Sequence, residues 1–106
     1  MKRVGSAEWR GDLKGGQGDI TTESGALKRQ AYSFSTRFEQ EPGTNPEELI
    51  AAAHAACYSM AFALTLSKKG YEPESIATQA TCSLEKQGDG FAITQMKLEV
   101  EGHVPD

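Results

Sequence analysis

The sequence has too few basic residues, too widely scattered, to form a nucleic-acid-binding surface. Its 106 residues include 11 Lys and Arg against 15 Asp and Glu, which gives a formal net charge of −4. The basic residues gather in nothing longer than pairs, such as Lys28-Arg29 and Lys68-Lys69. Because binding to a phosphate backbone needs a basic patch or stripe, we expect no nucleic acid among the partners.

Cysteine is also scarce, and the sequence carries no recognisable secretory signal. The chain has 2 cysteines, Cys57 and Cys82, and polar residues follow Met1 where a signal peptide would have an apolar segment. We therefore expect no disulfide scaffold. Two free thiols are typical of a protein in a reducing cytoplasm, which is the location that we predict.

Long hydrophobic runs are absent, with one exception between Leu49 and Leu66. This run is rich in alanine, is interrupted by His54, Ser59 and Thr65, and stands alone in a polar chain. These features favour a buried helix of a soluble protein over a membrane span.

The residues around the run predict a helix of about two dozen residues, or roughly 36 Å at 1.5 Å per residue. Asn45 and Glu48 form a capping-box pattern around Pro46, which suits the first helical position. Gly70, after a basic last turn, is the expected C-terminal stop. A helix that is apolar on nearly all faces is normally buried. Because a chain of this length buries only about two-thirds of its unfolded surface, we expect a homodimer.

The rest of the sequence predicts strands joined by glycine turns. Three strands, expected at residues 2–10, 19–23 and 26–38, form an antiparallel meander. After the helix, residues 76–86 and 91–100 alternate in polarity around a hairpin turn at Gly88-Asp89-Gly90, with a phase switch near Gln95 that predicts a β-bulge. The prediction is one α+β domain covering residues 1–106, an antiparallel sheet packed with a long buried central helix.

Cys57, in the middle of the predicted helix, is the first candidate for chemistry. A buried structural thiol is the simpler interpretation, because free cysteine is among the most buried residue types. A reactive thiolate in mid-helix needs a cation from elsewhere in the fold. His54 lies one turn before Cys57, so a Cys57/His54 hydrolase is an alternative, although a core or interface histidine is the more ordinary reading.

Arg37 is a better candidate activator than His54. It is expected at the end of a strand, before the loop that leads into the helix, where its guanidinium could stabilise a thiolate and bind a peroxide oxygen. Glu47 could orient that arginine through a bidentate ion pair, although a glutamate in the first helical turn needs no such role. Glu47 and Cys57 lie about 15 Å apart along the axis, so a shared site needs a bridging arginine or a second subunit. Cys82 is expected to be a small core residue rather than a resolving thiol.

The helix sequence resembles the signature of the OsmC/Ohr family, the osmotically inducible and organic hydroperoxide resistance proteins. The resemblance rests first on residues 43–57, GTNPEELIAAAHAAC, and extends to residues 8–12, 22–25, 36–39 and 90–94. It covers essentially the whole chain and favours the OsmC branch over Ohr.

This resemblance implies a cytoplasmic thiol peroxidase that reduces organic hydroperoxides without a cofactor or a metal. Cys57 corresponds to the peroxidatic cysteine, Arg37 to the arginine that activates it, and Glu47 to the glutamate that holds the arginine. The family fold implied is an intertwined α+β homodimer, with sites at the subunit interface. An external thiol or dithiol, such as a lipoylated protein, is the implied reductant.

The chain departs from the family pattern at its end. Family members continue through a helix with a Gly-Cys-Pro motif, whose cysteine resolves the oxidised Cys57 equivalent, and Cys82 does not match that motif. We therefore interpret the sequence as a C-terminally truncated domain, which is either a fragment of a longer product or a version that lacks the resolving half. In the second case an external thiol must reduce Cys57, or the chain is inactive as a peroxidase. The alternative from another functional class is a non-catalytic, dimerising, stress-associated binding module on the same fold.

Overall fold

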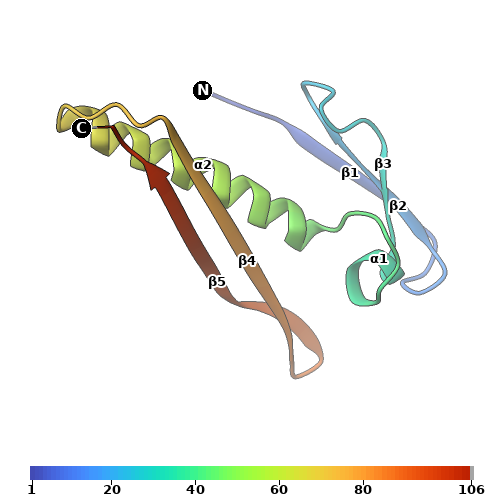
Figure 1. Cartoon of the computed structure of the whole chain (residues 1–106). Coiled ribbons are helices and arrows are strands. Elements are labelled where there is room, and N and C mark those ends of the chain that lie inside the picture. The colour runs from blue at the N-terminus through green and yellow to red at the C-terminus, as the bar shows by residue number, and fades with distance from the viewer. Residues whose placement is uncertain (106) are drawn as a thin grey trace. The chain divides into compact units, whose positions relative to one another are not determined.

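The structure, a computed structural model, describes residues 1–105 and contains two compact units that divide at Pro46. The first unit contains three strands and a short helix, namely β1 (Gly5–Arg10), β2 (Gln17–Thr22), β3 (Gln30–Tyr32) and α1 (Phe34–Phe38). The second contains a long helix and a hairpin, namely α2 (Pro46–Lys68), β4 (Ser75–Gln87) and β5 (Gly90–His103) (Figure 1). The α+β class with antiparallel sheets is confirmed.

In the first unit the predicted meander is present, with strand order β1-β2-β3 and antiparallel pairing throughout. Across β1 and β2, Arg10 donates hydrogen bonds to the carboxylates of Glu8 and Asp19. These bonds raise the pKa of the Arg10 guanidinium above its ordinary value. Since the cluster is largely exposed, it contributes little to stability and mainly marks the solvent face of the sheet.

The prediction of a long third strand at residues 26–38 is wrong. Arg29 has a φ of +51°, only Gln30–Tyr32 pair as β3, and the chain then turns into α1. The helix forms because Ser33 and Thr36 make a capping box. The Thr36 N–H donates to Ser33 Oγ at 3.3 Å and the Ser33 N–H donates to Thr36 Oγ1 at 2.8 Å. These local bonds override the alternation of aromatic and polar residues.

The predicted long helix is confirmed as α2, and its C-terminal stop is as expected. Gly70 has a φ of +87°. The Tyr71 N–H donates to the Leu66 carbonyl at 2.9 Å, and the Gly70 N–H donates to the Ser67 carbonyl at 3.0 Å. This pair of bonds is a Schellman motif, which satisfies the last helical carbonyls and requires a residue that tolerates positive φ.

The predicted hairpin and its bulge are also confirmed. Ser83 pairs with Gln95 and Leu84 with Ile93, so Thr94 is the additional residue on β5. The bulge allows Ile93 and Met96 to lie on the same side of the hairpin despite their odd spacing. In β4 the alternation is as predicted, because Ile76, Thr78, Ala80, Cys82 and Leu84 are half-buried while most of their neighbours are exposed.

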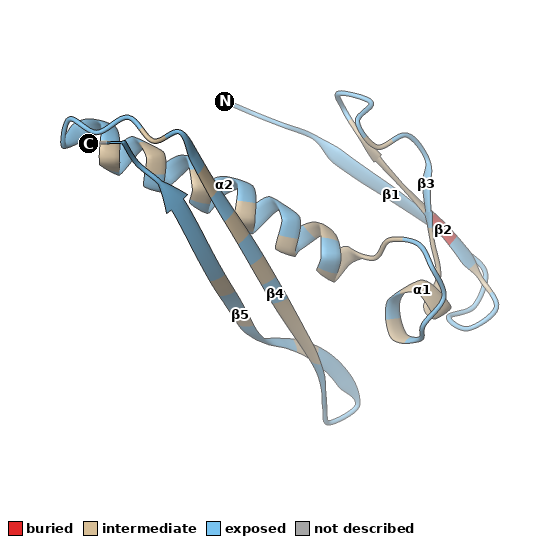
Figure 2. Ribbon diagram, in the orientation of Figure 1, coloured by how far each residue is buried: buried red, intermediate tan, exposed pale blue. Residues whose placement is uncertain are grey.

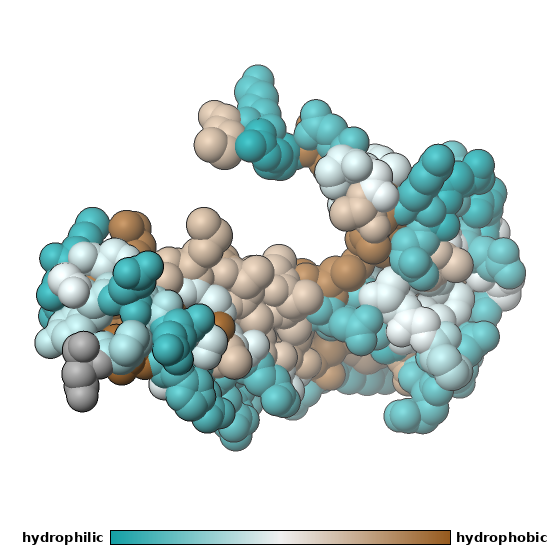
Figure 3. Space-filling model, turned by 45° about the horizontal axis from the view of Figure 1, so that its top comes forward, coloured by the Kyte–Doolittle hydropathy of each residue, from teal (hydrophilic) through white to brown (hydrophobic). Residues whose placement is uncertain are grey.

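Burial of the central helix is not found within one chain. No residue of α2 is buried, and Gly18 is the single buried residue among residues 1–105 (Figure 2). Exposed hydrophobic side chains lie open on the surface (Figure 3). The physical reason is that the second unit has too few elements to cover the helix. A two-stranded hairpin follows α2, and it covers only one side of a helix that is apolar nearly all round.

Candidate active site

Cys57 is an exposed free thiol near the middle of α2. Ser59 defines the opposite, covered side of the helix, since its Oγ lies 2.7 Å from Thr78 Oγ1 of β4. The half-buried positions Ala51, Ala55 and Ala63 follow the same side at helical spacing. Because two residues turn an α-helix through about 200°, Cys57 points away from β4.

An uncovered apolar surface surrounds the thiol on α2. We call it the thiol stripe, and its members recur at spacings of three and four residues, namely Ile50, Ala53, Cys57, Met60 and Leu64. Met60 is 79% exposed and Leu64 57%. A thiol in this setting would meet an apolar reactant without displacing polar side chains. By length and composition α2 is also apolar enough to cross a membrane, a property that core helices of soluble proteins share.

The Cys57/His54 pairing required for a hydrolase is not formed. His54 is exposed on α2, and no hydrogen bond joins it to Cys57 in the part of the chain that the structure describes. A general base must lie within hydrogen-bond reach of the group it deprotonates. The arrangement therefore gives the hydrolase alternative no support.

Glu47 and Glu48 lie in the first turn of α2, as predicted. Glu47 is half-buried and Glu48 is exposed. Ten residues separate Glu47 from Cys57 on this helix, or about 15 Å of axis. The structure therefore places the two residues on one helix without bringing their side chains together.

Arg37 lies in the last turn of α1, in the first unit, and not at the end of a strand as predicted. Its Cζ lies 5.0 Å from the centroid of the Phe38 ring. This cation–π distance orients the guanidinium against a half-buried aromatic ring. Arg37 is thus held by its own short helix, while Cys57 and Glu47 belong to the second unit.

Cys82 is half-buried on β4, opposite Met96. Because Cys57 points away from β4, the two sulfur atoms do not face one another, and a direct disulfide would need the helix to turn. This geometry agrees with the interpretation of Cys82 as a packing residue rather than a resolving thiol.

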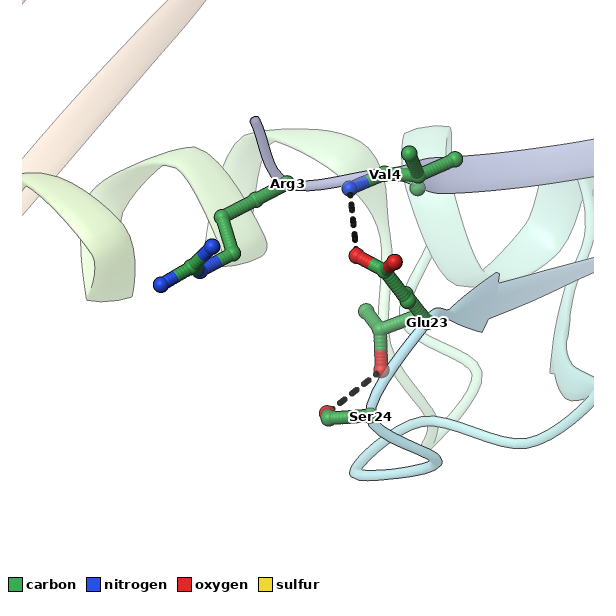
Figure 4. Close-up of a pocket in the computed structure, with 6 residues that line it drawn as sticks. Arg3, Val4, Glu23 and Ser24 are labelled. Carbon is green, nitrogen blue, oxygen red and sulfur yellow. Dashed lines mark hydrogen bonds between the residues drawn. The ribbon is translucent and has the colours of Figure 1, made fainter. Parts of the chain in front are cut away.

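The surface also contains hollows that the sequence did not reveal. One of about 530 Å³ lies beside the start of β1, where the Val4 N–H donates to Glu23 Oε2 at 3.2 Å (Figure 4). It contains none of the predicted site residues. A second, of about 190 Å³, lies beside Arg37 and is lined by aromatic rings. No cluster of metal-binding side chains occurs within residues 1–105.

Comparison with known proteins identifies the family. Residues 38–106 match the family described as OsmC-like protein. The chain is 57% identical over 105 residues to peroxiredoxin OsmC of Escherichia coli strain K12, covering 99% of this chain and 73% of that protein. The chain belongs to the OsmC-like family. This confirms the resemblance drawn from the helix signature, and it agrees with the choice of the OsmC branch.

Members of the Ohr branch are more distant relatives of this OsmC-like chain. The organic hydroperoxide resistance protein OhrB of Bacillus subtilis is 33% identical over 82 residues, which cover 76% of this chain and 60% of that protein. The crystal structure of that OhrB superposes with a TM-score of 0.58 at 27% identity, over 95% of this chain and 70% of the other. An organic hydroperoxide resistance protein from Elizabethkingia anophelis gives a TM-score of 0.67 at 18% identity, over 100% and 73%, and shows the shared fold.

Proposed function

We propose that this OsmC-like chain is a cysteine-based peroxidase that reduces organic hydroperoxides to alcohols. The observation that carries the proposal is the exposed thiol of Cys57, set in an apolar stripe of a chain that is 57% identical to a named peroxiredoxin. In the reaction the Cys57 thiolate attacks the terminal peroxide oxygen. A sulfur–oxygen bond forms, the O–O bond breaks, and the alkoxide takes a proton to leave as an alcohol. Cys57 ends as a sulfenic acid.

Arg37 and Glu47 complete the proposed site. The Arg37 guanidinium stabilises the thiolate and polarises the O–O bond, because preorganised cations act most strongly where negative charge develops. Glu47 orients the guanidinium through an ion pair. The hold of Phe38 on Arg37 supports this role, since a fixed cation needs less reorganisation than a mobile one.

Return of Cys57 to the thiol requires an external reductant in this proposal. Cys82 lies on the strand from which Cys57 points away, which favours a dithiol in solution over an internal disulfide. A dithiol attacks the sulfenic sulfur, releases water, and then closes its own disulfide as it frees Cys57. The reaction needs neither a metal nor an organic cofactor.

A homodimer is the assembly that we propose. Within the second unit, the thiol stripe leaves Ile50, Met60 and Leu64 exposed at 43%, 79% and 57%. Apolar side chains gathered on one face of a helix are typical of a surface that another chain covers. A second copy that covers the thiol stripe would supply this burial and explain an apolar helix in a cytoplasmic protein without a membrane partner.

The experiment that tests the function is mass analysis after oxidation. Reduced protein is treated with one equivalent of an organic hydroperoxide, then examined by intact mass and peptide mapping. We expect one oxygen on Cys57 that a sulfenic-acid reagent traps. An unmodified Cys57 would contradict the peroxidase and favour the binding module, and a Cys57–Cys82 disulfide would contradict the interpretation of Cys82 as a packing residue.

A further inference from the structure

Thr36, the residue before Arg37, is tied to a residue outside its own helix. The Asn45 Nδ2 donates a hydrogen bond to the Thr36 carbonyl at 3.1 Å, across nine positions of the sequence. Helix α1 has five residues, and a helix leaves its last four carbonyls without a partner of its own. Asn45 therefore supplies a donor that α1 itself does not have. Both residues are half-buried and belong to the first unit.

The loop that leads from α1 to α2 also packs against Thr36. Gly43 in this loop has a φ of +146°, and a Cβ built on it would lie 3.0 Å from Thr36 Cγ2. Glycine suits this position because it tolerates the positive φ and has no side chain to hold the loop away. A hydrogen bond from Asn45 and a close approach by Gly43 thus hold the loop on the same residue of α1.

Asparagine meets two requirements at position 45. Because Pro46 is the first residue of α2, Asn45 occupies the position where a side-chain oxygen caps a helix. Serine and aspartate cap helices about as well as asparagine. The asparagine side chain, however, also carries an amide NH₂, so it can donate to the Thr36 carbonyl while its oxygen remains available to the helix. Capping alone does not explain this hydrogen bond, which points to a second role for the residue.

The hydrogen bond shortens the path along the chain between two residues of the proposed site. Thr36 directly precedes Arg37, and Asn45 lies two residues before Glu47. A loop that is not fastened samples many conformations, and ordering it costs conformational entropy. Because the bond is present before any reactant binds, Asn45 fixes the turn that bears Arg37 relative to the residue that begins α2.

From this arrangement we propose that Asn45 is a positioning residue of the peroxidase, which holds the Arg37 turn against the start of α2 and keeps the cation in reach of Glu47. The proposal rests on the function proposed above, in which Arg37 activates the Cys57 thiolate and pairs with Glu47. Asn45 contacts no reactant and acts through Arg37. A cation that is already in place stabilises developing charge better than one that must be ordered during the reaction.

Activity supplies the first test, through a substitution that keeps the helix cap and the net charge. Asn45→Ser removes the amide donor, and we expect kcat/KM for cumene hydroperoxide with dithiothreitol to fall roughly tenfold. Asn45→Asp, which also caps a helix but has no N–H to donate, should show a similar loss. The matched control is Gln40→Ser, which removes the amide of an exposed residue in the same loop and should change the rate little. Activity in either Asn45 variant equal to that of the control would overturn the proposal.

A double-mutant cycle separates positioning of Arg37 from a general structural role. If Asn45 acts through Arg37, the Arg37→Ala/Asn45→Ser protein should be no slower than Arg37→Ala alone. Losses that multiply would mean that Asn45 acts independently of the cation, and the positioning role would be wrong. Gly43→Ala provides a second route, since it pushes the loop away from Thr36 without changing Asn45. It should show the same non-additivity with Arg37→Ala, which keeps the test decisive if Asn45→Ser fails to fold.

Alkylation of Cys57 tests the proposal without peroxide turnover. In a Cys82→Ser background, iodoacetamide at neutral pH reacts with the Cys57 thiolate, which a nearby cation favours. We expect slower alkylation in Arg37→Ala and in Asn45→Ser, with no further loss in the double variant. If the unmodified chain reduces no hydroperoxide but shows this pattern, the peroxidase function fails and the role of Asn45 in placing Arg37 stands. If it reduces hydroperoxide while Asn45→Ser matches Gln40→Ser in both assays, the peroxidase stands and the positioning role fails.

Discussion

The two units of this chain position their candidate catalytic side chains differently. In the first, Arg37 is exposed but follows the capping box of a short helix and has the Phe38 ring against its guanidinium. In the second, Cys57 sits on a long regular helix with its side chain exposed and few specific contacts. The cation is positioned by its own unit, while the thiol depends on what covers the helix.

The largest loss of activity should follow substitution of Cys57 in the second unit. Cys57→Ser should abolish dithiol-dependent reduction of cumene hydroperoxide, with kcat falling roughly 10⁴-fold or more, because no other group supplies the nucleophile. Cys82→Ser is the matched control and should keep nearly full activity. Peroxide consumption measured with dithiothreitol distinguishes them. Equal loss in both variants would mean that Cys82 takes part in the chemistry.

The preorganised cation of the first unit should have the next largest effect. Arg37→Ala should lower kcat/KM about 10²-fold, the usual consequence of removing one donor that stabilises transition-state charge. Arg29→Ala removes an exposed arginine of the same unit, which lies 3.8 Å from Asp19, and should change the rate little. If the two variants behave alike, Arg37 is a surface arginine and the contrast between the units is wrong.

Packing in the first unit can be broken at Gly18. Gly18→Ala forces a Cβ to within 2.6 Å of the Trp9 and Tyr32 rings. We expect a loss of about 2 kcal/mol in the free energy of unfolding, as for other overpacked sites. Urea denaturation followed by Trp9 fluorescence gives the value. Gly5→Ala is the control, since its added Cβ would meet nothing closer than 4.0 Å, and it should be neutral or slightly stabilising.

A substitution at the C-terminal end of α2, in the second unit, should have a smaller effect on stability. Gly70→Ala places a Cβ at a φ of +87°, next to open space, so the loss comes from backbone strain alone. A decrease of about 1 kcal/mol in the free energy of unfolding is expected. Lys69→Ala, one residue earlier, should leave stability nearly unchanged. Thermal denaturation at fixed protein concentration compares the two, and equal melting temperatures would contradict the role of the Schellman motif.

The smallest effect should be at His54. His54→Ala removes an exposed imidazole that makes no hydrogen bond to Cys57, and peroxidase activity should stay within about twofold. A loss as large as that of Cys57→Ser, together with ester hydrolysis by the unmodified chain, would instead favour the hydrolase. The assay uses cumene hydroperoxide and a p-nitrophenyl ester in parallel.

The sequence predicted the second unit far better than the first. Helix α2 was readable because Pro46, the following glutamates and Gly70 provide start and stop signals around one apolar run. The hairpin was readable because polarity alternates along β4 and changes phase once on β5. Regular periodicity over many residues is strong evidence, and the bulge followed from it.

In the first unit, periodicity gave the wrong prediction for Tyr32 to Phe38. Aromatic and hydroxyl residues alternate there as in a strand, but Ser33 and Thr36 cap a short helix, a local signal that alternation hid. The prediction placed Arg37 on the wrong kind of element, although it named the residue correctly. The aromatic hollow could not be predicted, since it depends on strand register that brings Trp9, Gly18 and Tyr32 together.

Burial of α2 stays a prediction, because it concerns an assembly and one chain leaves the helix exposed. Hydropathy reports that a helix will be covered, and not by which chain. Within residues 1–105 the hairpin covers the side marked by Ser59 and leaves the thiol stripe open. The sequence indicated that a second copy is needed, because the helix is apolar nearly all round in a chain of 106 residues. Which side of the helix stays uncovered depends on the packing of the hairpin and was visible only in the structure.

The bulge at Thr94 has a consequence for how this protein can vary. Side chains alternate between the two faces of a strand, so one inserted or deleted residue moves every following side chain to the other face unless a bulge absorbs the change. Thr94 is the additional residue that the bulge absorbs, which is why Met96, Leu98 and Val100 share a face with Ile93. Deleting Thr94 would remove the bulge and leave Ile93 and Met96 two positions apart, so these residues would keep their face. Deleting Lys97 instead would turn Leu98 and Val100 to the other face, so a single deletion in β5 should be tolerated at the bulge and rejected after it.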